Sequence, residues 1–213
     1  MLKKMLFSLF ASSALSAAPQ AVVFDWGKVL ADPDRKMIVA FLCDSLGITK
    51  EEFELANLQK QEKQVSEIEF WVEFAMKHGR ALPEDWSERY RSVSRAALNV
   101  DNEMYALVDE LKAKGIPVAL LSNIQKRYAD LIRSFGLYEP FTPCLLSGET
   151  GIAKPDPKAF KLLLQALSLP ASDVIFIDDL AANIEAAHNS GIDAIQFESL
   201  SQLKKELSQR GLL

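Results

Sequence analysis

Short apolar runs alternate with amphipathic stretches along most of this chain. Runs rich in β-branched and aliphatic residues predict strands, and the longer segments between them repeat apolar residues at the spacing of one helix face. The expected strands are 21–24, 117–121, 144–146, 174–177 and 194–197. Strands and helices in succession favour an α/β fold, a parallel sheet with right-handed crossovers.

One long interval interrupts this alternation. Residues 34–98 contain no convincing strand and predict several helices, the first ending at Gly47 and the next beginning at the capping sequence 49–52. The interval is too long for a loop inside a compact domain. We therefore expect a core domain of residues 19–33 and 99–213, and a small all-helical cap domain of residues 34–98.

The first 18 residues have the layout of a secretory signal peptide. A basic start precedes an apolar stretch from Met5 to Leu15, and small residues follow at 16–18. The stretch is too short for a stable membrane anchor. The pattern predicts an exported, periplasmic protein cleaved after Ser16; the alternative is an additional amphipathic helix on a cytoplasmic protein.

The composition and net charge are those of an ordinary globular protein and do not favour nucleic acid as a partner. The 213 residues are 49% hydrophobic and 25% charged, enough for one sizeable core with a small accessory unit. The net charge of −5 gives no long-range attraction to nucleic acid. Cys43 and Cys144 lack the spacing of a metal site, and His78 and His188 show no ligand pattern. We expect the two cysteines to be buried small hydrophobic residues and the two histidines to be structural or surface residues.

Polar residues directly follow the first two predicted strands. Asp25 follows the run 21–24, where a carboxylate can be a nucleophile that accepts a phosphoryl group; a turn aspartate is the alternative, because Asp-x-Gly is common in turns. Ser122 and Asn123 follow the run 117–121, where they can hold phosphate oxygens or cap the next helix. Both roles are compatible, since a helix N-terminus attracts anions.

Lys154 lies between Gly151 and Pro155, in a segment whose backbone is stiffened by proline. A lysine held there can neutralise an attacking carboxylate and the charge of a transition state. The alternative is a solvated surface lysine, which is the usual state of this residue type.

Asp178 and Asp179 end the most apolar predicted strand. Two adjacent carboxylates at a buried strand end are costly unless they are paired or bound to a metal, and Mg²⁺ prefers oxygen ligands. The alternative is capping of the following helix, near its positive end. Asn183, one helical turn further on, is placed to fix this loop.

These polar segments should meet in space. Parallel strands present their ligands beyond their carboxyl ends, so we expect Asp25, Ser122, Lys154 and Asp178 at one crevice. The chain contains no Gly-x-x-x-x-Gly-Lys nucleotide loop and no Gly-x-Ser-x-Gly elbow.

The order of the segments resembles the haloacid dehalogenase (HAD) superfamily over residues 21–197. The four family motifs have counterparts in Val-Phe-Asp-Trp-Gly-Lys-Val-Leu at 23–30, Leu-Ser-Asn at 121–123, Lys-Pro-Asp-Pro at 154–157 and Phe-Ile-Asp-Asp at 176–179. Within the superfamily the chain is similar to the sugar-phosphatase-like branch with Asp-x-Gly-x-Val, which includes the phosphatase half of epoxide hydrolases. The resemblance implies a Rossmann-like core and identifies the insert as the family's cap.

The resemblance implies a Mg²⁺-dependent phosphatase acting on a small phosphorylated metabolite, with sugar phosphates as candidates. Asp25 would form an aspartyl-phosphate, and Ser122, Asn123 and Lys154 would hold the phosphoryl group. The resemblance assigns the magnesium ion to Asp25, the main-chain carbonyl of Gly27, Asp178 and Asp179.

Gly27 departs from the usual family pattern. Most family phosphatases carry Asp-x-Asp, whose second Asp is the general acid and base, and glycine cannot transfer a proton. Lys28, the next residue, could add positive charge near the phosphate or be solvated. The departure keeps two alternatives open: a metal-free haloacid dehalogenase, and a non-catalytic fold member that binds a phosphorylated ligand or a partner.

Overall fold

The computed structural model describes residues 20–61 and 65–213. The predicted signal segment, residues 1–18, lies outside the described residues, so export stays a prediction. Among the helices that are described, none has the length and apolar character needed to cross a bilayer.

The core is one five-stranded parallel sheet in the order β3-β2-β1-β4-β5. Its strands are β1 (Ala21–Phe24), β2 (Val118–Ser122), β3 (Cys144–Leu146), β4 (Val174–Asp178) and β5 (Asp193–Gln196). The predicted α/β fold is confirmed, and each predicted strand is present within one residue at either end. Because β1 lies between β2 and β4, the chain reverses its direction of growth beside β1, which is where such sheets bind ligands.

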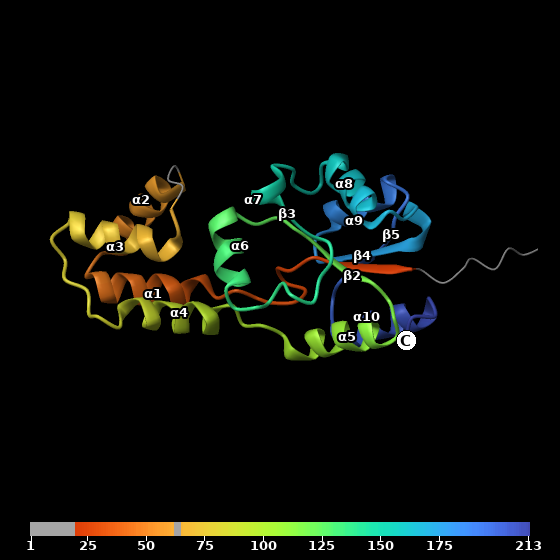
Figure 1. Cartoon of the computed structure of the whole chain (residues 1–213), viewed down its shortest axis with the longest axis horizontal. Helices are drawn as coiled ribbons and strands as arrows, with labels where there is room; N and C mark the ends of the chain where they lie inside the picture. The colour runs from red at the N-terminus through yellow and green to blue at the C-terminus, as the bar shows by residue number, and fades with distance from the viewer. Residues whose placement is uncertain (1–19, 62–64) are drawn as a thin grey trace, which may run out of the picture.

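Helices cover both faces of the sheet (Figure 1). Alternate strand residues face opposite sides: Val22 and Phe24 pack in one apolar cluster and Val23 in another. The first cluster includes α5 (Asn102–Ala113) and α10 (Leu200–Gln209), and the second includes α8 (Pro157–Leu167) and α9 (Ala181–Asn189). The helix α6 (Lys126–Arg133) lies between the sheet and the helices at the left of Figure 1, and α7 (Ser147–Thr150) follows β3. The short 3₁₀ turn Ala171–Asp173 precedes β4.

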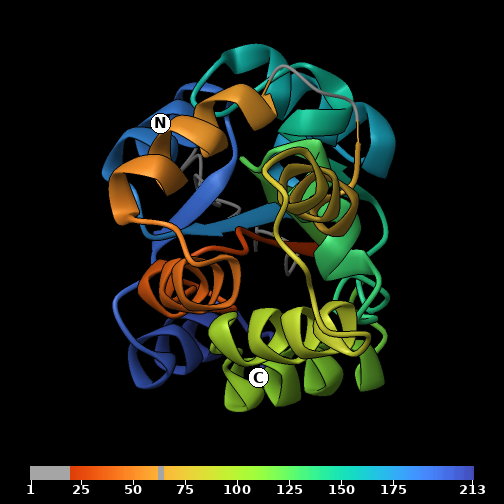
Figure 2. The same cartoon turned by 90° about the vertical axis from the view of Figure 1, so that its left-hand side faces the viewer.

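The described part of residues 34–98 folds as helices without a strand, as predicted. These are α1 (Arg35–Leu46), α2 (Lys50–Gln61), α3 (Glu67–Lys77) and α4 (Trp86–Ala97), grouped at the left of Figure 1 and towards the viewer in Figure 2. Gly47 ends α1 with a left-handed φ of 60°, a conformation that glycine adopts without strain. The predicted cap at 49–52 is present, because the Thr49 and Glu52 side chains each accept a bond from the other's main-chain N–H.

The cap has its own apolar cluster. Trp71, Trp86 and Tyr90 are almost fully buried in it. Leu131 of α6 joins the same cluster, so the core domain contributes to its packing. The cap is therefore seated on α6 by apolar contact.

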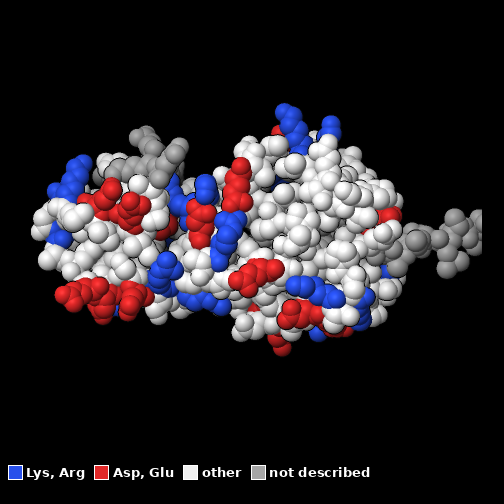
Figure 3. Space-filling model, viewed as in Figure 1, with Lys and Arg blue, Asp and Glu red and all other residues white. Residues whose placement is uncertain are grey.

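A buried ion pair inside the cap contacts Arg127 of the core at the same place. The Lys60 ammonium lies 2.7 Å from Glu67, and the two side chains are 3% and 2% exposed. Arg127 of α6 lies 3.8 Å from the other Glu67 oxygen and donates a hydrogen bond to the Lys60 carbonyl. Burial lowers the pKa of Lys60, and Glu67 opposes that shift. On the surface over α6, by contrast, basic and acidic side chains lie side by side in solvent (Figure 3).

Candidate active site

The predicted polar residues converge at the carboxyl edge of the sheet. Asp25 follows β1 and extends its ladder, because its N–H donates to the Ile177 carbonyl at 2.8 Å. Ser122 and Asp178 are the last residues of β2 and β4, the two neighbours of β1. The predicted convergence is confirmed for these strand-end residues, and Lys154 reaches them from the loop between α7 and α8.

Lys154 is the centre of this arrangement. Its ammonium lies 2.8 Å from Asp25 Oδ1 and 2.6 Å from Asp178 Oδ2, and the residue is only 4% exposed. The alternative of a solvated surface lysine is therefore wrong. One buried cation bridges the first and fourth motifs.

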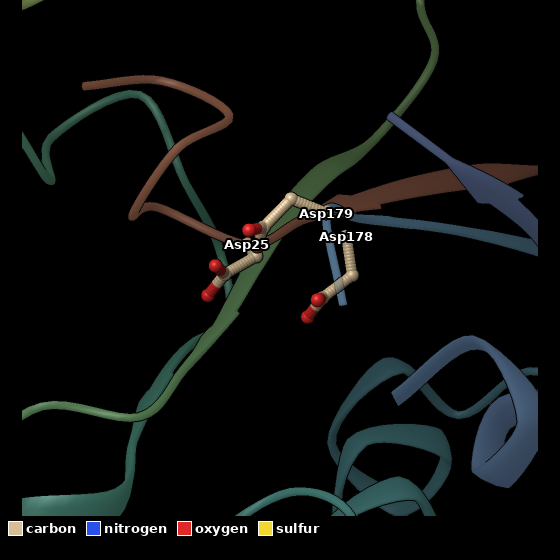
Figure 4. Close-up of side chains that lie close together, drawn as sticks. All are labelled: Asp25, Asp178 and Asp179. Carbon is tan, nitrogen blue, oxygen red and sulfur yellow. The ribbon is translucent and has the colours of Figure 1, made fainter. Parts of the chain in front are cut away.

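Asp25, Asp178 and Asp179 form an acidic cluster (Figure 4), in which one oxygen of each lies within 4.8 Å of the others. Burial raises the pKa of Asp25; Lys154 opposes this shift and Asp178 adds to it. Burial and Asp178 also raise the pKa of Asp179. Three carboxylates face one ammonium, so a divalent cation with oxygen ligands would balance the site. The residues present fit Mg²⁺.

The Asp178 carboxylate is held in place by its neighbours. Asn183 Nδ2 lies 3.0 Å from both Asp178 oxygens, and the Leu180 N–H donates to Oδ1 at 2.8 Å. The predicted fixing of this loop by Asn183 is confirmed. Capping of α9 is not the main role of the pair, because the residue at the N-cap is Leu180, which makes no side-chain cap bond.

Ser122 and Asn123 do not cap the next helix. That helix begins at Lys126, and its N-cap is Gln125. Ser122 is buried, and its hydroxyl hydrogen bond lowers the pKa of Asp25, the weakest of the influences on that group. Both polar atoms of the Asn123 side chain bond the main chain of Lys154. A substrate would therefore contact the main chain of Asn123 and not its side chain. This partnership could not be seen in the sequence, since the two residues are 31 positions apart.

Gly27 lies in a tight loop after Asp25. The N–H groups of Leu30 and Ala31 both donate to the Trp26 carbonyl, and Lys28 adopts a left-handed φ of 61°. A Cβ atom added at Gly27 would meet only Asp25 Oδ2, at 3.9 Å. The position thus has room for a side chain but carries none.

Lys28 points to solvent. Its ammonium pairs with Asp32 at 2.7 Å, and both side chains are more than half exposed. The bond to Asp32 raises the pKa of Lys28. Of the two interpretations of this residue, the solvated one fits the structure.

A cavity of about 440 Å³ opens between the cap and the core. Gly27, Ser122 and Asn123 line its core side, which places it beside the acidic cluster. Helices α1, α2, α4 and α6 supply much of the rest of the wall, together with the loop residues Pro33 and Asp34. Sequence patterns could not identify these cap residues, because a side chain facing the crevice and one facing the cap interior have the same helical spacing.

A family model described as haloacid dehalogenase-like hydrolase matches residues 19–191. The chain belongs to the haloacid dehalogenase-like hydrolases. The match covers all four motifs that suggested this family. It shows a hydrolase, and it leaves the substrate and the roles of single residues open.

Curated relatives of this hydrolase match it only in part. An acyl-CoA dehydrogenase family member from mouse is 35% identical over 49% of this chain and 10% of its own length. A phosphatase from Mycobacterium tuberculosis is 27% identical over 50% of this chain and 52% of its own length. The chain thus spans at most about half the length of these two relatives.

A solved HAD-family enzyme from Bacteroides thetaiotaomicron shares the fold. Its complex with magnesium and inorganic phosphate aligns with a TM-score of 0.61 and 23% identity, covering 87% of this chain and 98% of the other. At this identity the likeness concerns the fold alone.

Proposed function

We propose that this hydrolase is a Mg²⁺-dependent phosphatase that cleaves a small phosphorylated metabolite through an aspartyl-phosphate on Asp25. The observation that carries the proposal is the buried Lys154 ammonium, which bridges Asp25 and Asp178 beside a third carboxylate. A metal-free dehalogenase has no need for Asp178 and Asp179 as a clamp.

The magnesium ion would be held by Asp25, Asp178 and Asp179, with the Gly27 carbonyl completing the protein ligands. When bound, it would offset the charge of the phosphoryl oxygens and of the acidic cluster. The phosphatase among the relatives and the structural neighbour's complex with magnesium and inorganic phosphate support a phosphatase that uses magnesium.

The protein groups then divide the work. The Asp25 carboxylate attacks phosphorus, a P–O bond to Asp25 forms, and the P–O bond to the alcohol breaks with its electron pair leaving on the alcohol oxygen. Ser122 and Lys154 hold the oxygens of the group in transfer. Water then attacks the aspartyl-phosphate, releasing phosphate and restoring Asp25.

Departure of the alcohol is the demanding step in this site. No carboxyl group stands at position 27, and the carboxylate that lines the described cavity wall, Asp34, accepts two main-chain N–H groups at the start of α1. General acid help is typically worth about 10²–10⁴-fold. Esters whose leaving group needs no proton should therefore be the better substrates.

Phosphate release tests the proposal. The purified protein should hydrolyse phenyl phosphate with Mg²⁺ and lose that activity with a chelator, and the nearly isosteric Asp25→Asn variant should be folded and inactive. Halide release from a 2-haloacid without metal would replace the proposal with a dehalogenase. Binding of phosphate without turnover of any ester would replace it with a non-catalytic role.

A further inference from the structure

The loop between β2 and α6, residues 123–125, lines the cavity and is held from behind by the short helix α7. The Ser147 hydroxyl accepts a hydrogen bond from the Ile124 N–H at 3.0 Å and donates one to the Ile124 carbonyl at 3.3 Å. The Gly148 N–H donates to the same carbonyl at 2.9 Å. Both main-chain groups of Ile124 are thus paired by the first two residues of α7.

Gly148 approaches this loop too closely to carry a side chain. A Cβ atom added there would lie 2.3 Å from the Lys126 nitrogen, 2.6 Å from the Ile124 oxygen and 2.9 Å from the Gln125 carbonyl carbon. All three are main-chain atoms, which cannot turn away as the end of a flexible side chain would. Gly148 does not have a left-handed φ, so close approach is the reason for glycine at this position.

The last two residues of α7 extend the same support. Glu149 pairs with Arg133 of α6 at 2.6 Å. Thr150 Oγ1 accepts from the Ile152 N–H at 3.2 Å, in the segment that leads to Lys154. The helix α7 therefore contacts the loop after β2, the helix that follows this loop, and the segment that carries the buried lysine.

We propose that Ser147 and Gly148 are positioning residues for the phosphoryl group in transfer. They fix the loop that begins with the Ser122 hydroxyl and the Asn123 main-chain N–H, the two groups of β2 and its loop that would hold phosphoryl oxygens. Such donors stabilise a transition state best when their places are set beforehand, because moving them during the reaction costs free energy. The inference rests on the proposed function and adds two residues that do not touch the substrate.

Ser147→Ala tests the inference with the loop otherwise intact. It removes both hydroxyl bonds and keeps the Gly148 contact, so the protein should fold. With phenyl phosphate, kcat should fall about 10-fold and KM should change less than about twofold, since the donors act mainly in the transition state. Calorimetry with Mg²⁺ and orthovanadate, a five-coordinate analogue of the group in transfer, should show a matching loss of affinity. Ser147→Thr keeps the hydroxyl and should restore both values to within about twofold of wild type.

Ser190→Ala is the matched control for the serine. Ser190 is also partly buried and donates to a main-chain carbonyl, that of Ala186 at 2.9 Å, but it lies near the start of β5, at the opposite edge of the sheet. The substitution should change neither kcat nor orthovanadate affinity. An equal loss in Ser147→Ala and Ser190→Ala would make the effect one of general stability and would overturn the inference.

Gly148→Ala should have the larger effect, because its Cβ must displace the loop. We expect kcat to fall about 100-fold or more in a protein that circular dichroism shows to be folded. Gly115→Ala is the control for backbone strain alone. Gly115 has a φ of 78°, no atom lies within 4 Å of an added Cβ, and the residue precedes β2 at the far edge of the sheet. Its replacement should lower the unfolding midpoint in urea and leave kcat unchanged.

Orthovanadate binding separates this inference from the proposed function. A wild-type protein that binds orthovanadate but cleaves no ester would defeat the proposed function, and the affinity of Ser147→Ala would still decide the role of α7. Unchanged kcat and unchanged orthovanadate affinity in Ser147→Ala would overturn the inference. A folded Gly148→Ala variant as active as wild type would overturn it as well.

Discussion

The Asn123 side-chain amide makes two hydrogen bonds to the main chain of Lys154. Its Nδ2 donates to the Lys154 carbonyl at 2.7 Å, and its Oδ1 accepts from the Lys154 N–H at 2.9 Å. Both polar groups of one peptide segment are thus tied to the end of β2. These two bonds, here called the clamp, fix the position of the Lys154 main chain relative to β2. They thereby help to place its ammonium between Asp25 and Asp178.

Removing the clamp should impair catalysis more than folding. Asn123→Ala loses both bonds and frees the Lys154 loop, so kcat should fall about 10- to 100-fold, which corresponds to about 1.4–2.7 kcal/mol. Asn123 is exposed, so the unfolding midpoint in urea should move little. Steady-state rates with phenyl phosphate and urea unfolding check the two halves. Unchanged kcat would show that the loop holds Lys154 without Asn123.

Sequence patterns predict the strand-end residues of this site, but they do not predict the clamp. Apolar runs ending in Asp25, Ser122 and Asp178 predict the strand ends, and parallel pairing then brings those side chains together. The orientation of Asn123 follows from a loop 31 residues away, which local pattern does not encode.

Sequence patterns also do not predict the buried charges of the cap, because their burial depends on a contact between distant segments. Lys60 and Glu67 belong to helices rich in exposed charge, and a charged residue there is normally solvated. Only the packing of the cap on α6, which brings Arg127 against Glu67, reveals that this pair is buried. The four-residue helix α7 was also missed, because so short an element has no periodicity to detect.

Gly27 offers a gain-of-function test. A Cβ fits there, so Gly27→Asp should place a carboxyl group beside Asp25 Oδ2 without distorting the loop. Proton donation should raise kcat for an alkyl phosphate by about 10-fold or more and leave an aryl phosphate nearly unchanged. Gly27→Asn is the matched control, since it has the same shape and cannot transfer a proton. Equal gains for both variants would show that shape, not acidity, limits the wild-type protein.

The raised pKa of Asp25 predicts how the metal-free protein responds to pH. A carboxyl group whose folded pKa lies above its unfolded value of 3.8 binds its proton more tightly when folded. Its contribution to stability is present below the unfolded pKa and is lost as pH rises through the folded pKa. In a chelator, Asp25→Asn should therefore be more stable than wild type at neutral pH, and the difference should shrink towards about pH 4.

Urea unfolding of both proteins across this pH range, with and without Mg²⁺, measures the effect. Saturating Mg²⁺ at about 100 times its Kd should add about 2.7 kcal/mol to the wild type. Asp178→Asn should abolish that gain. A wild type that is more stable than Asp25→Asn at neutral pH without metal would contradict the account of the charge balance.

Removing one partner of the buried Lys60–Glu67 ion pair should destabilise the protein more than replacing both partners with apolar residues. Lys60→Met leaves the buried Glu67 without its main partner and should cost about 3–5 kcal/mol, whereas the double variant Lys60→Met/Glu67→Leu should recover much of that loss. The exposed pair Lys126–Asp130 is the control, and Lys126→Ala should cost no more than about 1 kcal/mol. Chemical unfolding of the four proteins gives these values. Equal costs at the two sites would mean that Lys60 is solvated.

Trapping the phosphorylated protein tests the central claim most directly. The protein is mixed with phenyl phosphate and Mg²⁺, quenched in acid within the first turnovers and digested for peptide mass spectrometry. The account predicts a phosphoryl group on Asp25, absent from the Asp25→Asn variant and from samples without Mg²⁺. A wild-type protein that turns over the ester with no phosphoryl group on Asp25, or with the group on another residue, would contradict it.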